Sequence, residues 1–105
     1  MPVPEIDIER LAELREQGAV LIDVRNPDEF ERFRVPGARL IPLPDVPERI
    51  EEIPSDQTVY VICATGNRSK RAVEFLNAQG HDTVNVAGGS QAWAEAGHPV
   101  ESGPG

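Results

Sequence analysis

The segment Cys63-Ala-Thr-Gly-Asn-Arg-Ser69 contains the only cysteine of the chain, followed by residue types that activate a thiol. Gly66 permits a tight curl in which successive backbone N–H groups turn inward and form an anion-binding nest. Arg68 adds a permanent cation with fork-shaped donors, and Ser69 can cap a helix or donate a hydrogen bond to sulfur. A lone cysteine is most often buried and inert, but these neighbours predict a reactive thiolate with a lowered pKa.

The charge of the chain is distributed unevenly around this segment. The whole sequence carries 18 Asp and Glu against 10 Lys and Arg, a formal net charge of −8. Between Gln57 and Val73 there is no acidic residue, and this stretch includes Arg68, Lys70 and Arg71. Nucleic acids and anionic membranes bind basic surfaces, so we expect neither as a partner. The non-acidic stretch around the thiol is compatible with a small anionic substrate.

The pattern along the chain predicts strands that alternate with helices. Asp7 can cap a first helix, and Asn26-Pro27-Asp28-Glu29 has the residue types of a second helix start. The expected helices cover 8–17, 27–33, 46–52, 68–79 and about 90–96, and the expected strands cover 19–24, 39–41, 58–63 and 83–86. Such alternation predicts an α/β fold with a central, mainly parallel sheet and helices on both faces.

This arrangement would place the thiol at a functional edge of the sheet. Ligands of parallel sheets bind beyond the carboxyl ends of the strands. Cys63 ends the most pronounced strand pattern and precedes a helix, so its sulfur should lie near a helix N-terminus, where the helix dipole favours an anion. Asp23 and Arg25 fall at the end of another strand, where an Asp–Arg pair would brace the backbone.

The length of 105 residues predicts a single domain, with a core over about 7–100 and a flexible tail at 101–105. No apolar run approaches the ~18 residues of a membrane helix, and the first residues lack the regions of a secretory signal, so we expect a cytoplasmic protein.

One cysteine excludes an internal disulfide and a cysteine-clustered metal site. His81 and His98 lie in turn sequences, so neither a metal nor a cofactor is expected.

Four motifs in this order resemble those of single-domain rhodaneses. Residues 63–69 fit the Cys-x-x-Gly-x-Arg-Ser loop, and residues 23–25 resemble the Asp-Val-Arg element. Residues 29–30, 35–38 and 41–43 resemble the Glu-Phe, Ile-Pro-Gly-Ala and Ile-Pro-Leu stretch. Gly88-Gly89 with Ala92-Trp93 matches the Gly-Gly and Ala-Trp element. The resemblance covers about residues 7–100 and implies a rhodanese-like fold.

The resemblance implies a sulfurtransferase that carries sulfur on Cys63 as a persulfide. The donor would be a small anion such as thiosulfate, and the acceptor cyanide or a thiol. Cys63 would be the catalytic nucleophile, and the rest of the loop would bind substrate: Ala64, Thr65, Gly66, Asn67, Arg68 and Ser69. Asp23 and Arg25 would support the site. With no second cysteine in the chain, the sulfur must leave to another molecule.

The sequence departs from the family pattern at two places, and the second leaves the sulfur donor open. Phe33-Arg34 stands where the family often has Gly-His, so the role of that His is not carried over to Arg34. Ala64 and Thr65 stand where some thiosulfate-using members have a basic residue, so a protein persulfide is an alternative donor.

Two other functions are compatible with parts of the pattern. A rhodanese-like module that only binds or senses would usually lack the cysteine, which is present here. A cysteine phosphatase or arsenate reductase would have five residues between cysteine and arginine, whereas four separate Cys63 from Arg68. The smaller ring of N–H groups suits a single sulfur atom better than a phosphate.

Overall fold

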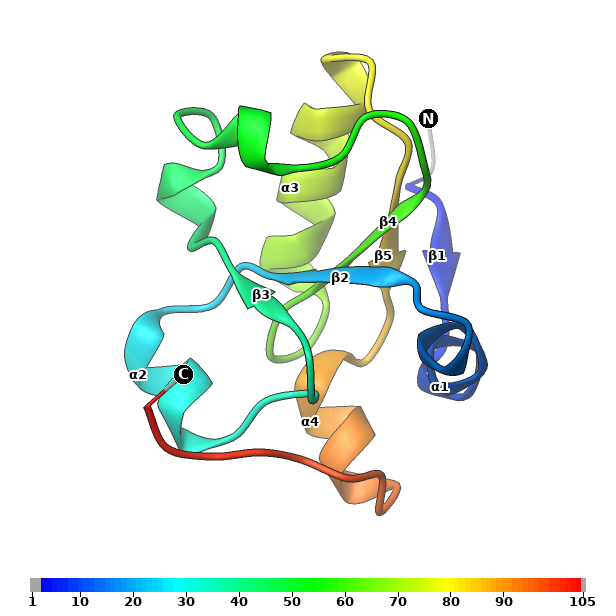
Figure 1. Ribbon diagram of the computed structural model, residues 1–105, viewed down its shortest axis with the longest axis vertical. Coiled ribbons are helices and arrows are strands. Elements are labelled where there is room, and N and C mark those ends of the chain that lie inside the picture. Colours follow the sequence, from blue (N-terminus) through cyan, green and yellow to red (C-terminus); the bar gives the residue numbers. More distant parts are fainter. Residues whose placement is uncertain (1–2, 105) are drawn as a thin grey trace.

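The computed structural model, which describes residues 3–104, is built on one central sheet (Figure 1). In this described part the sheet has five strands, all parallel, in the order β1-β5-β4-β2-β3. The strands are β1 (Glu5–Ile6), β2 (Val20–Asp23), β3 (Arg39–Leu40), β4 (Val59–Ile62) and β5 (Thr83–Val86). The predicted parallel α/β architecture is therefore confirmed.

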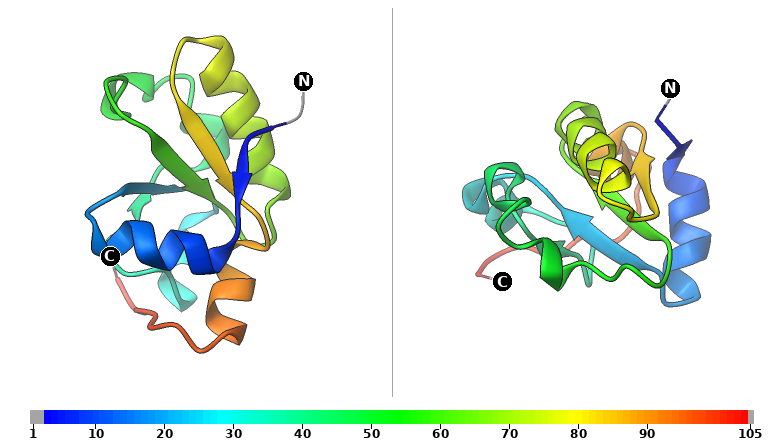
Figure 2. Two further views of the ribbon diagram at one scale, coloured as in Figure 1. Left: turned by 90° about the vertical axis from the view of Figure 1, so that its right-hand side faces the viewer. Right: turned by 90° about the horizontal axis from the view of Figure 1, so that it is seen from above.

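Helices cover both faces of the sheet, as Figure 2 shows for α1 and α3. The α-helices are α1 (Ile8–Glu16), α2 (Pro27–Arg32), α3 (Asn67–Ala78) and α4 (Gly89–Glu95). Two short 3₁₀ turns, η1 (Leu43–Asp45) and η2 (Ile50–Glu52), lie between β3 and β4. Over residues 3–104, no helix combines the length and the apolar character needed to cross a membrane.

The core consists of two apolar layers, one on each face of the sheet. Successive residues of a strand point to opposite faces. Val61 accordingly packs with Val73 and Leu76 of α3, whereas Ile62 packs with Leu11 of α1 and Trp93 of α4. The strands that carry the site are thus fixed from both sides.

Two elements differ from the sequence prediction. The prediction of a helix over 46–52 was wrong, since η1 and η2 flank a turn there. Pro54 keeps Ile53 extended, at φ −98° and ψ 121°, so the helical segment is limited to one 3₁₀ turn. Strand β1 was not predicted. It is two residues long and is defined by its pairing with β5, since the Asn85 N–H donates to the Pro4 carbonyl (2.8 Å) and the Ala87 N–H to the Ile6 carbonyl (2.9 Å).

The segment 101–104 is held against the domain, whereas the sequence predicts a flexible tail. Glu101 forms an antiparallel bridge with Arg34, and the Gly103 N–H donates to the Glu31 carbonyl (2.7 Å). These contacts join residues about 70 positions apart, and no local pattern indicates them. Gly105, the remainder of the predicted tail, lies outside the described residues.

Candidate functional site

The predicted site residues leave the sheet at one edge, where the parallel strands β2 and β4 both end. Asp23 is aligned in register with Ile62, and the Val24 N–H donates to the Ile62 carbonyl (3.0 Å). Cys63, the next residue, therefore begins its loop directly beside the residues that follow β2. The fold brings the Asp-Val-Arg element and the cysteine loop together, although Asp23 and Cys63 lie 40 positions apart in the sequence.

The cysteine loop takes its shape from two glycines and from the start of α4. Gly66 has a φ of +104° and precedes α3, and Gly89 has a φ of +63°. A Cβ at Gly89 would come within 2.4 Å of the Cys63 carbonyl oxygen, so the close approach of α4 requires glycine.

The beginning of α4 also orients the peptide groups of the loop. The Ser90 N–H donates to the Cys63 carbonyl (2.8 Å), and the Gln91 N–H donates to the Ala64 carbonyl (3.0 Å). In a trans peptide the N–H points opposite to the C=O. Since these carbonyls point toward α4, the N–H groups of Ala64 and Thr65 point away from it, into the loop.

The thiol of Cys63 lies at the centre of this curl and is 1% exposed. The Gly66 N–H (3.1 Å) and the Ser69 hydroxyl (3.3 Å) donate to Sγ. Burial acts to raise the pKa of Cys63. The hydrogen bond from the Ser69 hydroxyl and those from the backbone N–H groups of Ser69, Gly66 and Thr65 outweigh this effect, so the pKa is lowered. The arrangement stabilises a thiolate.

Replacing Ser69 with alanine is expected to raise the pKa of Cys63 and to slow its alkylation at neutral pH. The substitution removes the donor with the largest pKa-lowering effect on Sγ, so less of the thiol is ionised. The rate of reaction with iodoacetamide, measured against pH, reports this pKa. Its inflection should move to higher pH in the variant.

Ser90→Ala is a matched control for this experiment. Ser90 is also buried beside the loop, but its hydroxyl makes no hydrogen bond within the part of the chain that the structure describes. Its removal should leave the alkylation profile of Cys63 unchanged. Equal shifts in the two variants would contradict a direct role of the Ser69 hydroxyl.

The remaining loop residues lie at different depths. Ala64 is half-buried, and Thr65 and Asn67 are exposed. Asn85 of β5 connects the loop to β1, since its Nδ2 donates to the Gly66 carbonyl (3.3 Å) and to Oε2 of Glu5 (2.8 Å). Sequence reasoning missed Asn85. The signal that could have found it is an amide between two valines of a predicted strand, and in the structure this side chain is 0% exposed.

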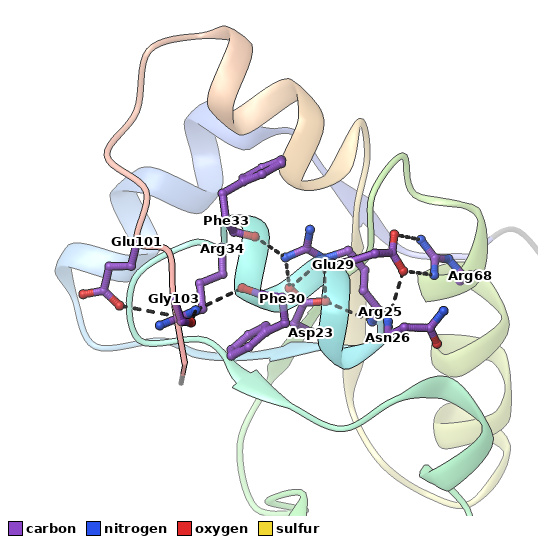
Figure 3. Close-up of polar contacts among 10 residues, drawn as sticks. All are labelled: Asp23, Arg25, Asn26, Glu29, Phe30, Phe33, Arg34, Arg68, Glu101 and Gly103. Carbon is purple, nitrogen blue, oxygen red and sulfur yellow. Dashed lines mark hydrogen bonds and ion pairs between the residues drawn. The ribbon is translucent and has the colours of Figure 1, made fainter.

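Arg68 is paired with an acidic residue of α2. Its guanidinium donates to both carboxylate oxygens of Glu29, at 2.7 and 2.8 Å (Figure 3). The hydrogen bonds from Arg68 lower the pKa of Glu29 to about 2 despite its partial burial, and the Asn26 N–H contributes. The pair is therefore fully charged at neutral pH. The sequence predicts the cation at Arg68, but not the carboxylate that neutralises part of its charge.

Asp23 and Arg25 form a buried ion pair, with side chains 0% and 2% exposed. Arg25 Nη2 donates to Asp23 Oδ2 (2.8 Å) and to the Phe33 carbonyl (2.8 Å), as Figure 3 shows. The Arg25 N–H also donates to Asp23 Oδ1 (3.0 Å). These contacts tie the turn after β2 to the end of α2.

A cavity of about 260 Å³ opens beside the cysteine loop. It is lined by Arg25, Glu29, Arg32, Phe33, Ala64, Ser90 and Gln91. The wall is therefore shared by α2, the turn after β2, the cysteine loop and the start of α4. A small anionic or polar substrate would fit here next to the residue that follows Cys63.

The two histidines lie outside this site. His98 stacks on Trp93, with 4.4 Å between the ring centroids, and His81 contacts the Pro54 carbonyl (3.3 Å). Both are half-buried and lie outside the helices and strands. Within residues 3–104, no three His, Cys, Asp or Glu side chains gather in a group that could hold a metal ion.

Comparisons with known proteins give one consistent result. The model of the rhodanese-like domain family matches residues 7–96. A sulfurtransferase from Allochromatium vinosum is 38% identical over 101 residues, which span 93% of this chain and 94% of that protein. The thiosulfate sulfurtransferase GlpE from Pseudomonas syringae is 38% identical over 86 residues, 81% of each chain.

A solved structure agrees with this result. The crystal structure of a rhodanese-related protein from Thermoplasma volcanium superimposes with a TM-score of 0.87 at 37% identity, and the match covers 93% of this chain and 97% of that one. The structural similarity thus extends over nearly the whole length of both chains.

Proposed function

This chain is a member of the rhodanese-like domain family, and from that premise we propose that Cys63 carries a sulfane sulfur from a donor such as thiosulfate to cyanide or a thiol. Relatives named as sulfurtransferases support the general activity. The donor and acceptor are part of our proposal.

In the first step, the Cys63 thiolate attacks the outer sulfur of thiosulfate. The new bond joins Sγ to that sulfur, while the sulfur–sulfur bond of the donor breaks and its electron pair leaves with sulfite. Three negative charges enter the step, and three leave it on the persulfide anion and on sulfite. An ionised thiol needs no general base, and the lowered pKa of Cys63 supports this.

In the second step, a nucleophile takes the outer sulfur. Cyanide attacks it, the bond to Sγ breaks, and the products are thiocyanate and the Cys63 thiolate. The inward N–H groups that stabilise the thiolate also suit the negative charge of the persulfide. Because the sequence has no second cysteine, the sulfur must pass to a separate molecule.

The observation that carries this proposal is the environment of Sγ. The sulfur accepts hydrogen bonds from the Gly66 N–H and the Ser69 hydroxyl, beside the N-terminus of the 12-residue helix α3. An inert structural cysteine does not require donors that favour its ionised form. The pairing of Arg68 with Glu29 reduces the positive charge at the site, which keeps a protein persulfide as an alternative donor.

Intact-mass measurement after incubation with thiosulfate tests the proposal. We expect the protein to gain the mass of one sulfur atom, and subsequent cyanide should remove it with release of thiocyanate. If thiosulfate adds nothing, a low-molecular-weight persulfide should be used in its place. If only that donor adds sulfur, Cys63 still forms a persulfide, but its donor is a persulfide and not thiosulfate.

The same experiment separates the other functions. A binding or sensor module would gain no sulfur from either donor, and that result would contradict the proposal. A phosphatase would hydrolyse a phosphate ester such as p-nitrophenyl phosphate, an activity that we do not expect because only four residues separate Cys63 from Arg68.

A further inference from the structure

Arg34 is a buried cation outside the cysteine loop, with 8% of its surface exposed. Its Nη1 donates to the Phe30 carbonyl (3.0 Å) and to the Gly103 carbonyl (2.7 Å), as Figure 3 shows. The guanidinium also lies over the Phe30 ring, 4.8 Å from its centroid. One side chain therefore joins α2 to a segment at the far end of the described chain.

Backbone hydrogen bonds complete this connection. The Arg34 N–H donates to the Glu101 carbonyl (2.8 Å), and the Glu101 N–H donates to the Arg34 carbonyl (3.0 Å). The Gly103 N–H donates to the Glu31 carbonyl (2.7 Å). We call residues 101–103 the strap. It runs past α2 beside the domain (Figure 1).

The helix under the strap is short and depends on partners at both ends. α2 has six residues, which is below the length at which a helix is stable in isolation. The carbonyls of Phe30 and Glu31 lie near its C-terminal end, where they lack intrahelical donors. Arg34 and the Gly103 N–H supply these donors. The strap therefore stabilises the end of α2.

The same helix carries residues that contact the candidate site. The two carboxylate oxygens of Glu29 accept hydrogen bonds from the Arg68 guanidinium. The carbonyl of Phe33, the residue after α2, accepts a hydrogen bond from Arg25. Glu29 and Phe33 also line the cavity beside the cysteine loop. A displacement of α2 would therefore change where Arg68 is held and how that cavity is shaped.

We propose that Arg34 and the strap are positioning elements for sulfur transfer, which hold α2 so that Glu29 keeps Arg68 fixed at the cysteine loop. This inference rests on the proposed function. The contact requires arginine at position 34, because the guanidinium contacts two carbonyls and an aromatic ring at once. The ammonium group of a lysine is a single point charge and cannot make these contacts together.

Two variants that disconnect the strap test the proposal. One ends the chain at Val100. The other is Gly103→Pro, which removes the N–H that binds the Glu31 carbonyl and cannot adopt the φ of +95° at this position. In both, α2 should exchange its amide hydrogens faster, while β4 and α3 keep the rates of the unaltered protein. The KM for the sulfur donor that loads Cys63 should rise about tenfold, because ordering a released Arg68 costs up to ~1.5 kcal/mol. The kcat should stay within about twofold.

Glu101→Ala is the matched control within the strap. It removes an exposed side chain that approaches Arg34 only to 4.0 Å, and it keeps the backbone bridge. Its KM and its exchange in α2 should equal those of the unaltered protein. A purely structural role of the strap would accelerate exchange throughout the domain and lower kcat, and either this result or unchanged exchange in α2 would overturn the proposal.

The hydrogen-exchange measurement distinguishes a failure of this proposal from a failure of the proposed function. It needs no sulfur donor and is measured on α2 directly. A chain that gains no sulfur from any donor, but shows faster exchange confined to α2 in both variants, would contradict the transfer activity and leave the connection from strap to α2 standing. Normal sulfur transfer with unaltered KM in both variants would contradict the positioning role alone.

Discussion

Replacing Cys63 with serine is expected to abolish sulfur transfer and to leave the fold intact. The persulfide needs a sulfur atom in the side chain, and no other residue of the sequence has a thiol. A serine hydroxyl is not ionised at neutral pH, so it is also a far weaker nucleophile in the same position. We expect turnover of thiosulfate and cyanide to fall by at least about a thousandfold, to the uncatalysed background.

The fold should survive because the change is small and local. Serine can accept the hydrogen bonds from the Gly66 N–H and the Ser69 hydroxyl that Sγ accepts now. Intact mass after thiosulfate, the rate of thiocyanate release and the urea midpoint of unfolding measure the three parts of this prediction. A variant with the midpoint and the turnover of the unaltered protein would place the sulfur chemistry outside Cys63 and refute the mechanism.

The part of the site that lies within one stretch of sequence was predictable because its contacts are local. The Gly66 N–H and the Ser69 hydroxyl lie three and six residues after Cys63, so a loop between a strand and a helix is long enough to bring them to the sulfur. The Asp23–Arg25 pair spans two residues and could be expected on the same ground. Residue type and spacing were sufficient for these contacts.

The contacts that sequence reasoning missed join distant parts of the chain. Glu29 meets Arg68 across 39 residues, Asn85 meets Gly66 across 19, and Arg34 meets Gly103 across 69. Each depends on the packing of elements whose positions no short pattern specifies. The missed strand β1 is of the same kind, since two residues become a strand only by pairing with β5.

Prolines explain the one expected helix that does not form. Pro47 has no N–H to donate to the Leu43 carbonyl, so η1 does not continue as an α-helix. Pro54 keeps Ile53 extended, at φ −98° and ψ 121°, so η2 ends after one turn. This segment still packs correctly, because Val46 and Ile53 are buried in the layer that α3 covers.

Replacing Asp23 with alanine is expected to lower the free energy of unfolding by about 3–5 kcal/mol, because it leaves the charge of Arg25 buried without its partner. Domains of this kind are stable by roughly 5–15 kcal/mol, so the loss is a large part of the total. Urea unfolding measures it. Asp28→Ala is the control, since its pair with Arg32 is exposed and 3.7 Å long, and its removal should cost about 0–1 kcal/mol.

A double variant, Asp23→Leu with Arg25→Met, then decides what the pair does for sulfur transfer. Replacing both charges by apolar side chains removes the uncompensated cation, so the double variant should be more stable than Asp23→Ala. If the pair only braces the turn after β2, the folded double variant should still load sulfur onto Cys63 at a rate within about tenfold of the unaltered protein. A stable double variant that cannot load sulfur would instead mean that Arg25, which lines the cavity beside Ala64, acts on the substrate itself.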